Sequence, residues 1–347
     1  MFEQSQLVFF HCVSPVHVGA GQAIGAIDNP IQRERHTGHP CFAASGLKGA
    51  LRDHFLEVTR ARFGKEEGPP EEDPRKRAEA LTDRLFGPLP RSNEEITHAG
   101  CVAFTDAQLL LLPVRSPRHA FAWITCPTAW ERFRRAALLA SGAGQAARTP
   151  GEPPPEGKGS PALPPAFPAS DANGAAPTGM ACWVASADEW PEEQVILDTL
   201  LLTHSGNNDL AGKIARWLQG NAFPAAFGFS NFSQKLARHL VVVSDLVFSH
   251  FVTHATLVEP HVKIDDVTGT VEEKLFFYTE NLPPESVLYS LAMVGKERTK
   301  DGRAAAAVLE DLRALDGQLV QIGGDATTGR GLVVLHFATD GRPAGGR

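Results

Sequence analysis

The sequence predicts an α+β fold built around a mostly antiparallel sheet. Two observations indicate this class. Apolar strand-like runs and helical repeats follow one another without a regular strand–helix alternation, and the chain closes on a strand, a glycine-rich loop and another strand, residues 319–337. A parallel sheet would instead require a helical crossover between successive strands. The sequence shows no internal repeat, and we expect residues 1–347 to form one domain.

Each element is predicted from local periodicity. Short apolar runs indicate buried strands, and apolar side chains three or four residues apart indicate helices. Leu47, Leu51, Phe55 and Val58 follow the helical spacing, with Ser45 as the expected N-cap. The predicted strands are residues 7–13, 100–112, 120–125, 181–185, 240–243, 248–258, 261–264, 287–294, 319–322 and 332–337. The predicted helices begin at Ser45 and cover residues 129–139, 188–203, 208–219 and 304–315, and residues 265–269 form a hairpin tip.

Residues 141–180 differ in composition from the rest of the chain. Pro, Gly and Ala occupy 25 of these 40 positions. Such a segment buries too little apolar surface to offset the entropy lost on ordering. We therefore predict a disordered insertion or a long surface loop here, because strand-like sequence resumes at Ala181. Residues 64–76, rich in Pro, Gly and charged side chains, are predicted to form an exposed loop.

The overall composition excludes several classes of protein. Hydrophobic residues make up 43% of the chain, enough for a core, and no apolar run approaches the roughly 18–20 residues that span a bilayer. The five cysteines are scattered and form no Cys-x-x-Cys pair. This pattern disfavours a disulfide framework and predicts a protein of the reducing cytoplasm. The net charge of −7 argues against a nucleic-acid partner for the chain as a whole.

The charge is unevenly distributed. Residues 31–65 contain seven Lys or Arg and three Asp or Glu, a formal charge of +4, which leaves −11 for the remainder. A polyanion responds to the field within about 8–10 Å and not to the sum over the chain. The basic strip, residues 31–65, is therefore a candidate nucleic-acid surface, although on charge alone a solvated helix face is the preferred explanation.

Two glycine-rich segments are candidates for ligand contact. Gly19–Gly25 has the spacing G-x-G-x-x-x-G and leads into Asp-Asn-Pro instead of a helix, so it does not match a dinucleotide-binding loop. Gly323–Gly331 has four glycines among its nine residues, includes Arg330, and lies between two predicted strands. Glycine permits close backbone approach, and exposed N–H groups can hold phosphate oxygens, with Arg330 as a clamp. A tight turn is the alternative reading.

Two further groups of residues suggest phosphate or metal chemistry. Lys48 and Arg52 lie four residues apart near the start of a predicted helix, where N–H groups and cations together attract phosphate. Asp28 lies in a loop near basic residues, where a carboxylate could activate a hydroxyl group or ligate Mg²⁺. An Asp-Asn-Pro turn is the simpler reading of Asp28. His17 is a candidate partner for Asp28 across the loop.

Taken together, the motifs resemble a known family. Asp28–Gly38, Ser45–Gly49 and Gly323–Gly331 occur in this order, with agreement also at Leu240–Asp245 and Ile264–Pro283. This arrangement is similar to that of the repeated backbone subunit (subunit four) of the type III-B CRISPR effector, the Cmr complex, within the RAMP superfamily. The resemblance covers most of the chain and is weakest at residues 64–80, 141–180 and 204–230.

The resemblance implies a fold and an activity. The fold would be an RRM-like (ferredoxin-like) palm with inserted finger segments and a thumb β-hairpin. Copies would assemble along crRNA with other Cmr subunits, away from any membrane, and would cleave target RNA at regular intervals in antiviral defence. Asp28 would be catalytic and hold Mg²⁺ or another divalent cation, and His17 matches a family histidine. The implied RNA-binding residues are Gln32, Arg33, Arg35, His36, Ser45, Lys48, Arg52, Gly323, Gly324, Thr327, Thr328, Gly329, Arg330 and Gly331.

Two other functions stay open at this point. The first is a structural crRNA-binding subunit without catalytic activity. The second is a crRNA-processing nuclease of the same superfamily, although such enzymes usually depend on a histidine-centred site and lack the motif that begins at Asp28. The chemistry of RNA suits the first function, cleavage of target RNA by a backbone subunit. The 2′-hydroxyl group supplies the nucleophile, so the protein need only position it and neutralise charge.

Overall fold

The computed structural model describes residues 2–22, 25–65, 73–89, 98–141, 163–167, 176–204, 208–225, 227–299 and 301–338. It confirms an α+β fold with a large, mostly antiparallel sheet. Within the described residues, no helix has the length and apolar character needed to cross a membrane. Most of the predicted disordered insertion lies outside these residues, as does much of the predicted loop at 64–76.

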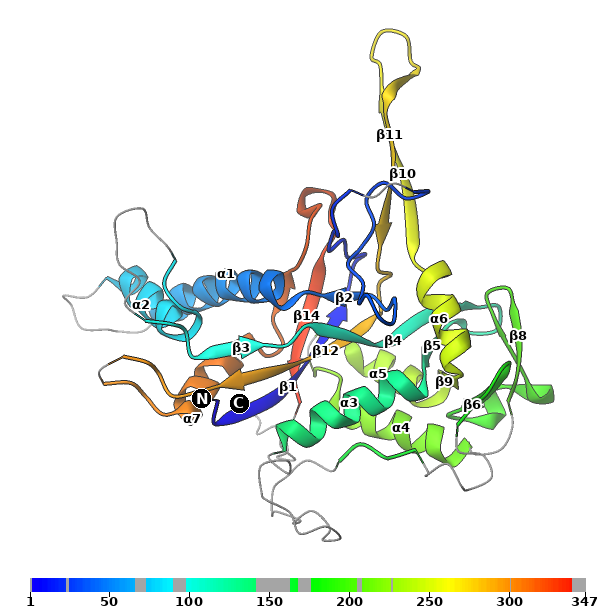
Figure 1. The fold of residues 1–347 in the computed structure, drawn as a ribbon, viewed down its shortest axis with the longest axis horizontal. Coiled ribbons are helices and arrows are strands. Elements are labelled where there is room, and N and C mark those ends of the chain that lie inside the picture. Colours follow the sequence, from blue (N-terminus) through cyan, green and yellow to red (C-terminus); the bar gives the residue numbers. More distant parts are fainter. Residues whose placement is uncertain are drawn as a thin grey trace.

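Twelve strands form the main sheet (Figure 1). Its order is β13 (Leu319–Gln321), β14 (Leu332–Phe337), β1 (Gln4–Cys12), β12 (Val287–Val294), β4 (Ala107–Ser116), β5 (Ala120–Thr125), β9 (Leu240–Val243), β6 (Ala181–Val184), β8 (Leu200–His204) and β7 (Gln194–Leu197). In addition β2 (Cys41–Phe42) pairs with β4, and β3 (Val102–Phe104) with β12. Only the pairs β5–β9 and β6–β8 are parallel among these strands.

Helices cover both faces of this sheet, and strand β1 contributes to both cores. Val8 and Phe10 point into one core with α1 (Ala44–Phe63), α2 (Pro74–Phe86) and α7 (Ala305–Leu312). Leu7 and Phe9 point into the other core with α3 (Pro127–Ala140), α4 (Asn208–Asn221) and α5 (Phe229–His239). Alternate side chains of a strand face opposite sides, so a continuous apolar run is required where both faces are covered.

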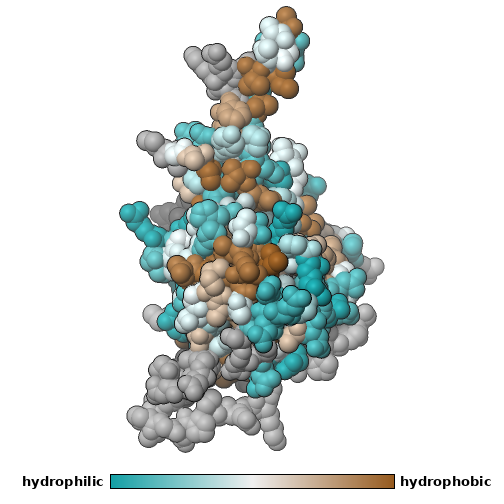
Figure 2. All heavy atoms as spheres, turned by 90° about the vertical axis from the view of Figure 1, so that its right-hand side faces the viewer, coloured by the Kyte–Doolittle hydropathy of each residue, from teal (hydrophilic) through white to brown (hydrophobic). Residues whose placement is uncertain are grey.

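A separate two-stranded hairpin projects from the main body (Figure 1). It consists of β10 (Leu257–Ile264) and β11 (Val271–Asn281) and turns at residues 265–270, which include the predicted tip at 265–269. Several apolar side chains along the hairpin are exposed, Val267 by 92%, and Figure 2 shows them above the more polar body. The hairpin therefore offers apolar surface that the chain itself leaves uncovered.

Three sequence predictions were wrong. Residues 194–204 form strands β7 and β8 instead of continuing a helix, because Val195, Leu197 and Leu202 are buried with the period of two typical of strands. The predicted strand at residues 248–258 is instead the end of helix α6 (Asp245–His254) followed by the start of β10. The Ser244 hydroxyl group caps α6 by accepting a hydrogen bond from Val247 N at 3.3 Å.

The third error concerns the start of α1. Ser45 is exposed inside the first turn, and the N-cap is Ala43, whose side chain cannot cap. The carboxylate of Asp106 instead accepts a hydrogen bond from Ala44 N at 2.7 Å. A residue 62 positions away thus satisfies a terminal N–H group, as a local cap would have done.

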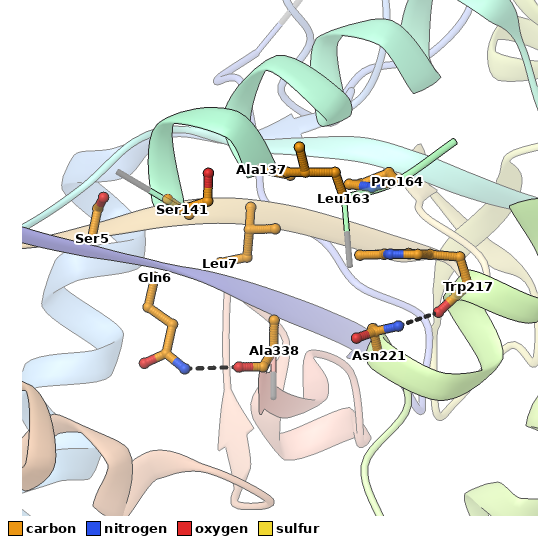
Figure 3. A pocket seen from close by; sticks show the side chains of 11 residues that line it. Ser5, Gln6, Leu7, Ala137, Ser141, Leu163, Pro164, Trp217, Asn221 and Ala338 are labelled. Atoms are coloured by element: carbon orange, nitrogen blue, oxygen red, sulfur yellow. Dashed lines mark hydrogen bonds between the residues drawn. The ribbon is translucent and has the colours of Figure 1, made fainter. Parts of the chain in front are cut away.

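One described part of the Pro-rich tract, residues 163–167, packs against α3. The Trp130 indole N–H donates to Pro165 O at 2.8 Å, and Arg134 Nε donates to Pro164 O at 3.0 Å. Beside this segment lies a cavity of about 50 Å³ lined by Leu163, Trp217 and others (Figure 3). A cavity this small holds one or two water molecules and is far below the several hundred Å³ of a typical ligand pocket.

Candidate active site at the base of the β10–β11 hairpin

The loop that follows β1 runs along the edge of β11 that faces away from β10. Val16 and Leu282 exchange two backbone hydrogen bonds of 2.9 Å. Farther along, Asn29 N donates to Tyr278 O at 3.0 Å and Glu280 N donates to Asn29 O at 3.0 Å. The loop is therefore hydrogen-bonded to β11 as a neighbouring strand would be, which fixes residues 16 and 29 against the base of the hairpin.

Asp28 lies on the outer surface of this loop. Its Oδ2 atom accepts a hydrogen bond from Tyr278 N at 2.8 Å, and its side chain is exposed. Within the described residues, its other carboxylate oxygen has no hydrogen-bond partner. One oxygen thus orients the side chain, and the other faces solvent, where a substrate or a cation can reach it.

The imidazole ring of His17 is held against the same strand, β11. Its Nδ1 atom lies 2.7 Å from Glu280 O, and only a protonated Nδ1 can donate to a carbonyl oxygen, so the neutral ring carries its lone pair on Nε2. Tyr278 and Glu280 are two residues apart on one strand, about 7 Å. The structure thus brings Asp28 and His17 to the same stretch of β11 without a direct hydrogen bond between them.

Glu280 is a central residue that the sequence reasoning missed. Its side chain is buried, and its carboxylate accepts hydrogen bonds from Arg33 Nη2 at 2.5 Å, Thr256 Oγ1 at 2.8 Å and Ile31 N at 3.1 Å. Its backbone oxygen also holds His17. No local signal marks it, because its partners lie up to 263 positions away along the chain.

The C-terminal glycine loop packs directly against the first loop. Gly324 N donates to His17 O at 2.8 Å, and Gly331 N donates to Pro15 O at 2.8 Å. Gly323 has a φ of +86°, and a Cβ atom there would lie 2.2 Å from His17 O. Only glycine fits this approach without displacing the His17 backbone. The two loops predicted separately from the sequence therefore form one surface.

The other predicted residues of the glycine loop differ in how far they are exposed to a ligand. Thr327, Thr328 and Gly329 are exposed at the tip of the loop, with Thr327 and Thr328 in the short η4 turn (Ala326–Thr328). Arg330 is half-buried, and its Nη2 atom lies 2.5 Å from Glu259 Oε2 on β10. This ion pair joins the loop to the hairpin, so phosphate contact by Arg330 would compete with it.

Gln32 and Arg33 are used internally. The Gln32 side chain donates to Gly19 O at 3.1 Å and accepts from Ala43 N at 2.9 Å, which joins the first loop to the N-terminus of α1. Arg33 donates to Gly38 O, to Val252 O and to the buried Glu280. Arg35 and His36 are exposed in the turn that follows.

Much of the basic strip is engaged in ion pairs. Within the part of the chain that the structure describes, four of its seven cations have an acidic partner: Arg33 with Glu280, Arg52 with Asp83, Arg60 with Glu79 and Arg62 with Asp311. On α1, Ser45 is exposed and Lys48 is half-buried, and burial lowers the pKa of Lys48. The formal charge of +4 therefore overstates the positive field that a polyanion would meet on this surface.

The donor set at Asp28 fits a divalent cation whose other ligands come from water and from a bound phosphate. Mg²⁺ commonly keeps several waters and binds one or two carboxylates together with substrate phosphates. One exposed carboxylate oxygen on Asp28 meets this requirement, whereas a cage made of protein ligands alone would need more. Within the described ranges, the residues grouped closely enough to hold a metal are His119, Glu189 and His239, away from Asp28 in the chain.

Comparison with known proteins identifies the class of protein that this fold and site represent. A sequence model of the RAMP superfamily matches residues 9–334, and the chain belongs to this superfamily. In particular, it is 28% identical over 331 residues to the CRISPR system Cmr endoribonuclease Cmr4 of Pyrococcus furiosus, a match that covers 95% of this chain and 94% of that protein.

Solved structures show the same fold. The crystal structure of oligomeric Cmr4 from Pyrococcus furiosus is similar with a TM-score of 0.63 at 24% identity, over 97% of this chain and 98% of that chain. A chain in the cryo-EM structure of the type III-B Cmr-beta complex bound to cognate target RNA also gives a TM-score of 0.63, at 18% identity, over 97% of this chain and 98% of that chain. The fold thus extends over nearly the whole of each relative.

Proposed function

We propose that this chain is a crRNA-binding backbone subunit of a type III-B CRISPR effector complex and cleaves target RNA at regular intervals. The similarity to Cmr4 supports the assignment to this complex. The single observation that supports catalysis is the Asp28 carboxylate, with one oxygen fixed by Tyr278 N and the side chain exposed, on the same stretch of β11 that holds His17.

In this proposal the main sheet contains the RRM-like palm and the β10–β11 hairpin is the thumb. The hairpin projects from the body, and its exposed apolar side chains suit contact with base faces better than contact with water (Figure 2). Inserted between the guide and target strands, the hairpin would displace a nucleotide close to the point where the hairpin joins the body. Asp28 lies at this point. Unstacked nucleotides have the backbone freedom that in-line attack requires.

The chemistry follows from RNA itself. The 2′-oxygen attacks the adjacent phosphorus atom and the bond to the 5′-oxygen breaks, which leaves a 2′,3′-cyclic phosphate and a 5′-hydroxyl group. Asp28 orients or deprotonates the 2′-hydroxyl group. His17, whose ring is held against β11 at Glu280 O, presents Nε2, which in its protonated form would donate to the phosphate or to the departing 5′-oxygen. A divalent cation held by Asp28 and RNA phosphates would supply neutralisation of the developing negative charge.

The test uses an assembled effector complex with complementary RNA and Mg²⁺. Asp28→Asn keeps an acceptor for Tyr278 N and removes the charge, so we expect cleavage to fall by about 100-fold or more while RNA binding is retained. Asp198→Asn, at an exposed carboxylate in the turn between β7 and β8, is the matched control and should cleave normally. A target RNA with 2′-deoxyribose at the cleaved positions should resist cleavage if the 2′-hydroxyl group is the nucleophile.

A structural subunit without catalytic activity is the alternative. In that case the wild-type complex would bind target RNA and yield no regularly spaced products. Equal cleavage by wild type and Asp28→Asn would remove Asp28 from the mechanism while leaving the assignment to the complex in place. Omission of divalent cations separately tests the metal, since we expect cleavage to stop and binding to continue.

A further inference from the structure

Far from Asp28 in the chain, three segments bring together the side chains of His119, Glu189 and His239. One potential ligand atom from each lies within 4.8 Å of the others. His119 is in the turn between β4 and β5, Glu189 ends the η1 turn (Ala187–Glu189), and His239 ends α5. The proposed RNA cleavage uses none of them.

The contacts within the cluster are those of groups that face one another. The rings of His119 and His239 stack with centroids 4.0 Å apart, and His239 Nε2 lies 3.4 Å from Glu189 Oε2. His119 Nε2 donates to Glu189 O at 3.1 Å, which leaves the other ring nitrogen with a lone pair. A metal-binding histidine typically donates its second ring N–H to a carbonyl or carboxylate in this way.

We propose that His119, Glu189 and His239 form a binding site for a divalent transition metal ion, with Zn²⁺ as the best match. Two imidazoles and one carboxylate are a ligand set that Zn²⁺ accepts in tetrahedral geometry, with water in the fourth position. Ligand atoms on tetrahedral Zn²⁺ are about 3.4 Å apart. The three groups lie within 4.8 Å of one another, so binding an ion would draw them closer together.

Lys235 competes with the metal for this site. Its Nζ atom lies 2.9 Å from His239 Nδ1 and 2.9 Å from His119 O. For His239 to bind the metal through Nε2, the ring proton must occupy Nδ1, where it would oppose the Lys235 amine. Metal binding therefore requires Lys235 to leave His239, while its bond to His119 O can persist. Arg238 also faces the cluster, with Nη1 3.8 Å from Glu189 Oε1.

The consequence of binding is structural. The three ligands are separated by 70 and 50 positions along the chain, and among the described residues no covalent cross-link joins their segments. An ion at this site would join the β4–β5 turn, the η1 turn and the end of α5. Since binding to the folded state alone raises the free energy of unfolding, the ion would stabilise this end of the sheet.

The experiment measures Zn²⁺ binding to the purified full chain by titration calorimetry, after dialysis against a chelator. We expect one ion per chain, a higher melting temperature with Zn²⁺, and no displacement by a large excess of Mg²⁺. Substitution of Co²⁺ should give the visible absorption of a tetrahedral site. Failure to bind one equivalent, or binding displaced by Mg²⁺, would contradict the proposal.

Variants separate this site from other surface histidines. His119→Ala and Glu189→Gln should each weaken Zn²⁺ binding by roughly tenfold or more. The matched controls are His254→Ala, at an exposed histidine that stacks on His250 in α6, and Glu193→Gln, in the neighbouring η2 turn (Pro191–Glu193). Both should bind as wild type does. Lys235→Met removes the competing amine and should tighten binding. Loss of binding in His254→Ala with retention in Glu189→Gln would assign the ion to α6 and overturn the proposal.

Discussion

The base of the hairpin and the surface of α1 carry similar charged residues but use them differently. At the hairpin, the buried carboxylate of Glu280 and the Arg33 guanidinium hold the loops in place, and the Asp28 carboxylate remains exposed. On α1, Arg52 and Arg60 form ion pairs with α2 across the helix interface, and Lys48 is half-buried. The first arrangement fixes a reactive group, whereas the second joins two helices.

The difference shows that a charge count does not measure the charge available to a ligand. An arginine in a short ion pair with a carboxylate presents little net field, and burial adds a desolvation cost if the pair is opened. The Asp28 carboxylate, which has no ion-pair partner among the described residues, is available to a ligand without such a cost. Variants that break one pair in each region would measure this contrast.

The largest effect on stability is expected at Glu280. Glu280→Gln leaves Arg33 without a counter-charge in a site where the carboxylate is 2% exposed. Removing one partner of a buried ion pair typically costs about 3–5 kcal/mol. We expect a loss near the lower end of that range in the free energy of unfolding from urea denaturation, because Arg33 retains two carbonyl acceptors. An unchanged midpoint would show that the pair does not support the loop.

The contact between the two loops can be tested with a pair of glycines. Gly323 and Gly329 both have positive φ, of +86° and +79°, but only at Gly323 would a Cβ atom collide with backbone, at His17 O. Gly329→Ala should cost about 1 kcal/mol from its φ alone. Gly323→Ala should cost more and should also lower target cleavage, because it displaces His17. Equal losses of unfolding free energy in the two variants would mean that the loops do not need their close contact.

A pH effect is expected at Glu285, which lies between β11 and β12 near β1. Burial raises its pKa from 4.5 to about 7. A carboxyl group with a higher pKa in the folded chain favours folding while it is protonated, so this contribution is full below pH 4.5 and is lost as pH rises to about 7. Glu285→Gln should therefore gain about 1–2 kcal/mol over wild type at pH 8 and little at pH 4. Denaturation at both pH values measures this, and a difference independent of pH would contradict it.

The smallest effect is expected on α1. The Arg52–Asp83 pair is partly exposed on its acidic side, and such pairs contribute about 0–1 kcal/mol. Asp83→Asn should thus lower the free energy of unfolding by at most about 1 kcal/mol. If Arg52 contacts RNA in the assembled complex, the same variant should increase RNA affinity and steepen its dependence on salt. Unchanged salt dependence would limit Arg52 to joining α1 and α2.

Local pattern predicted much of the fold correctly. The strands at residues 120–125 and 287–294, the helix at 208–219 and the hairpin tip at 265–269 lie where the sequence placed them, within a few residues. The errors arose where local and tertiary signals disagree. Residues 248–254 are rich in aromatic and β-branched side chains, yet they form α6, because the buried side chains Val247, Phe248, Phe251 and Val252 follow helical spacing.

The candidate site shows the same division. Asp28, His17 and the glycine loop could be selected from the sequence because their chemistry and backbone requirements are properties of each residue. Glu280, Asp83 and Glu259 could not be selected from the sequence. They are the ion-pair partners of Arg33, Arg52 and Arg330, and each pair joins residues 31 to 247 positions apart. The predicted roles of the basic strip in RNA binding stay predictions. The acidic residues that pair with its cations would compete with RNA for them.

The sequence by itself therefore determined the α+β class, the membership of the RAMP superfamily, and the residues that carry reactive groups. These depend on side-chain type and on short-range periodicity, both of which can be read along the chain. Only the tertiary structure decided which charges are paired, which edge of β11 holds Asp28 and His17, and that the two glycine loops meet. Those outcomes depend on distances between residues far apart in sequence, which are set when the sheet and its covering helices pack together.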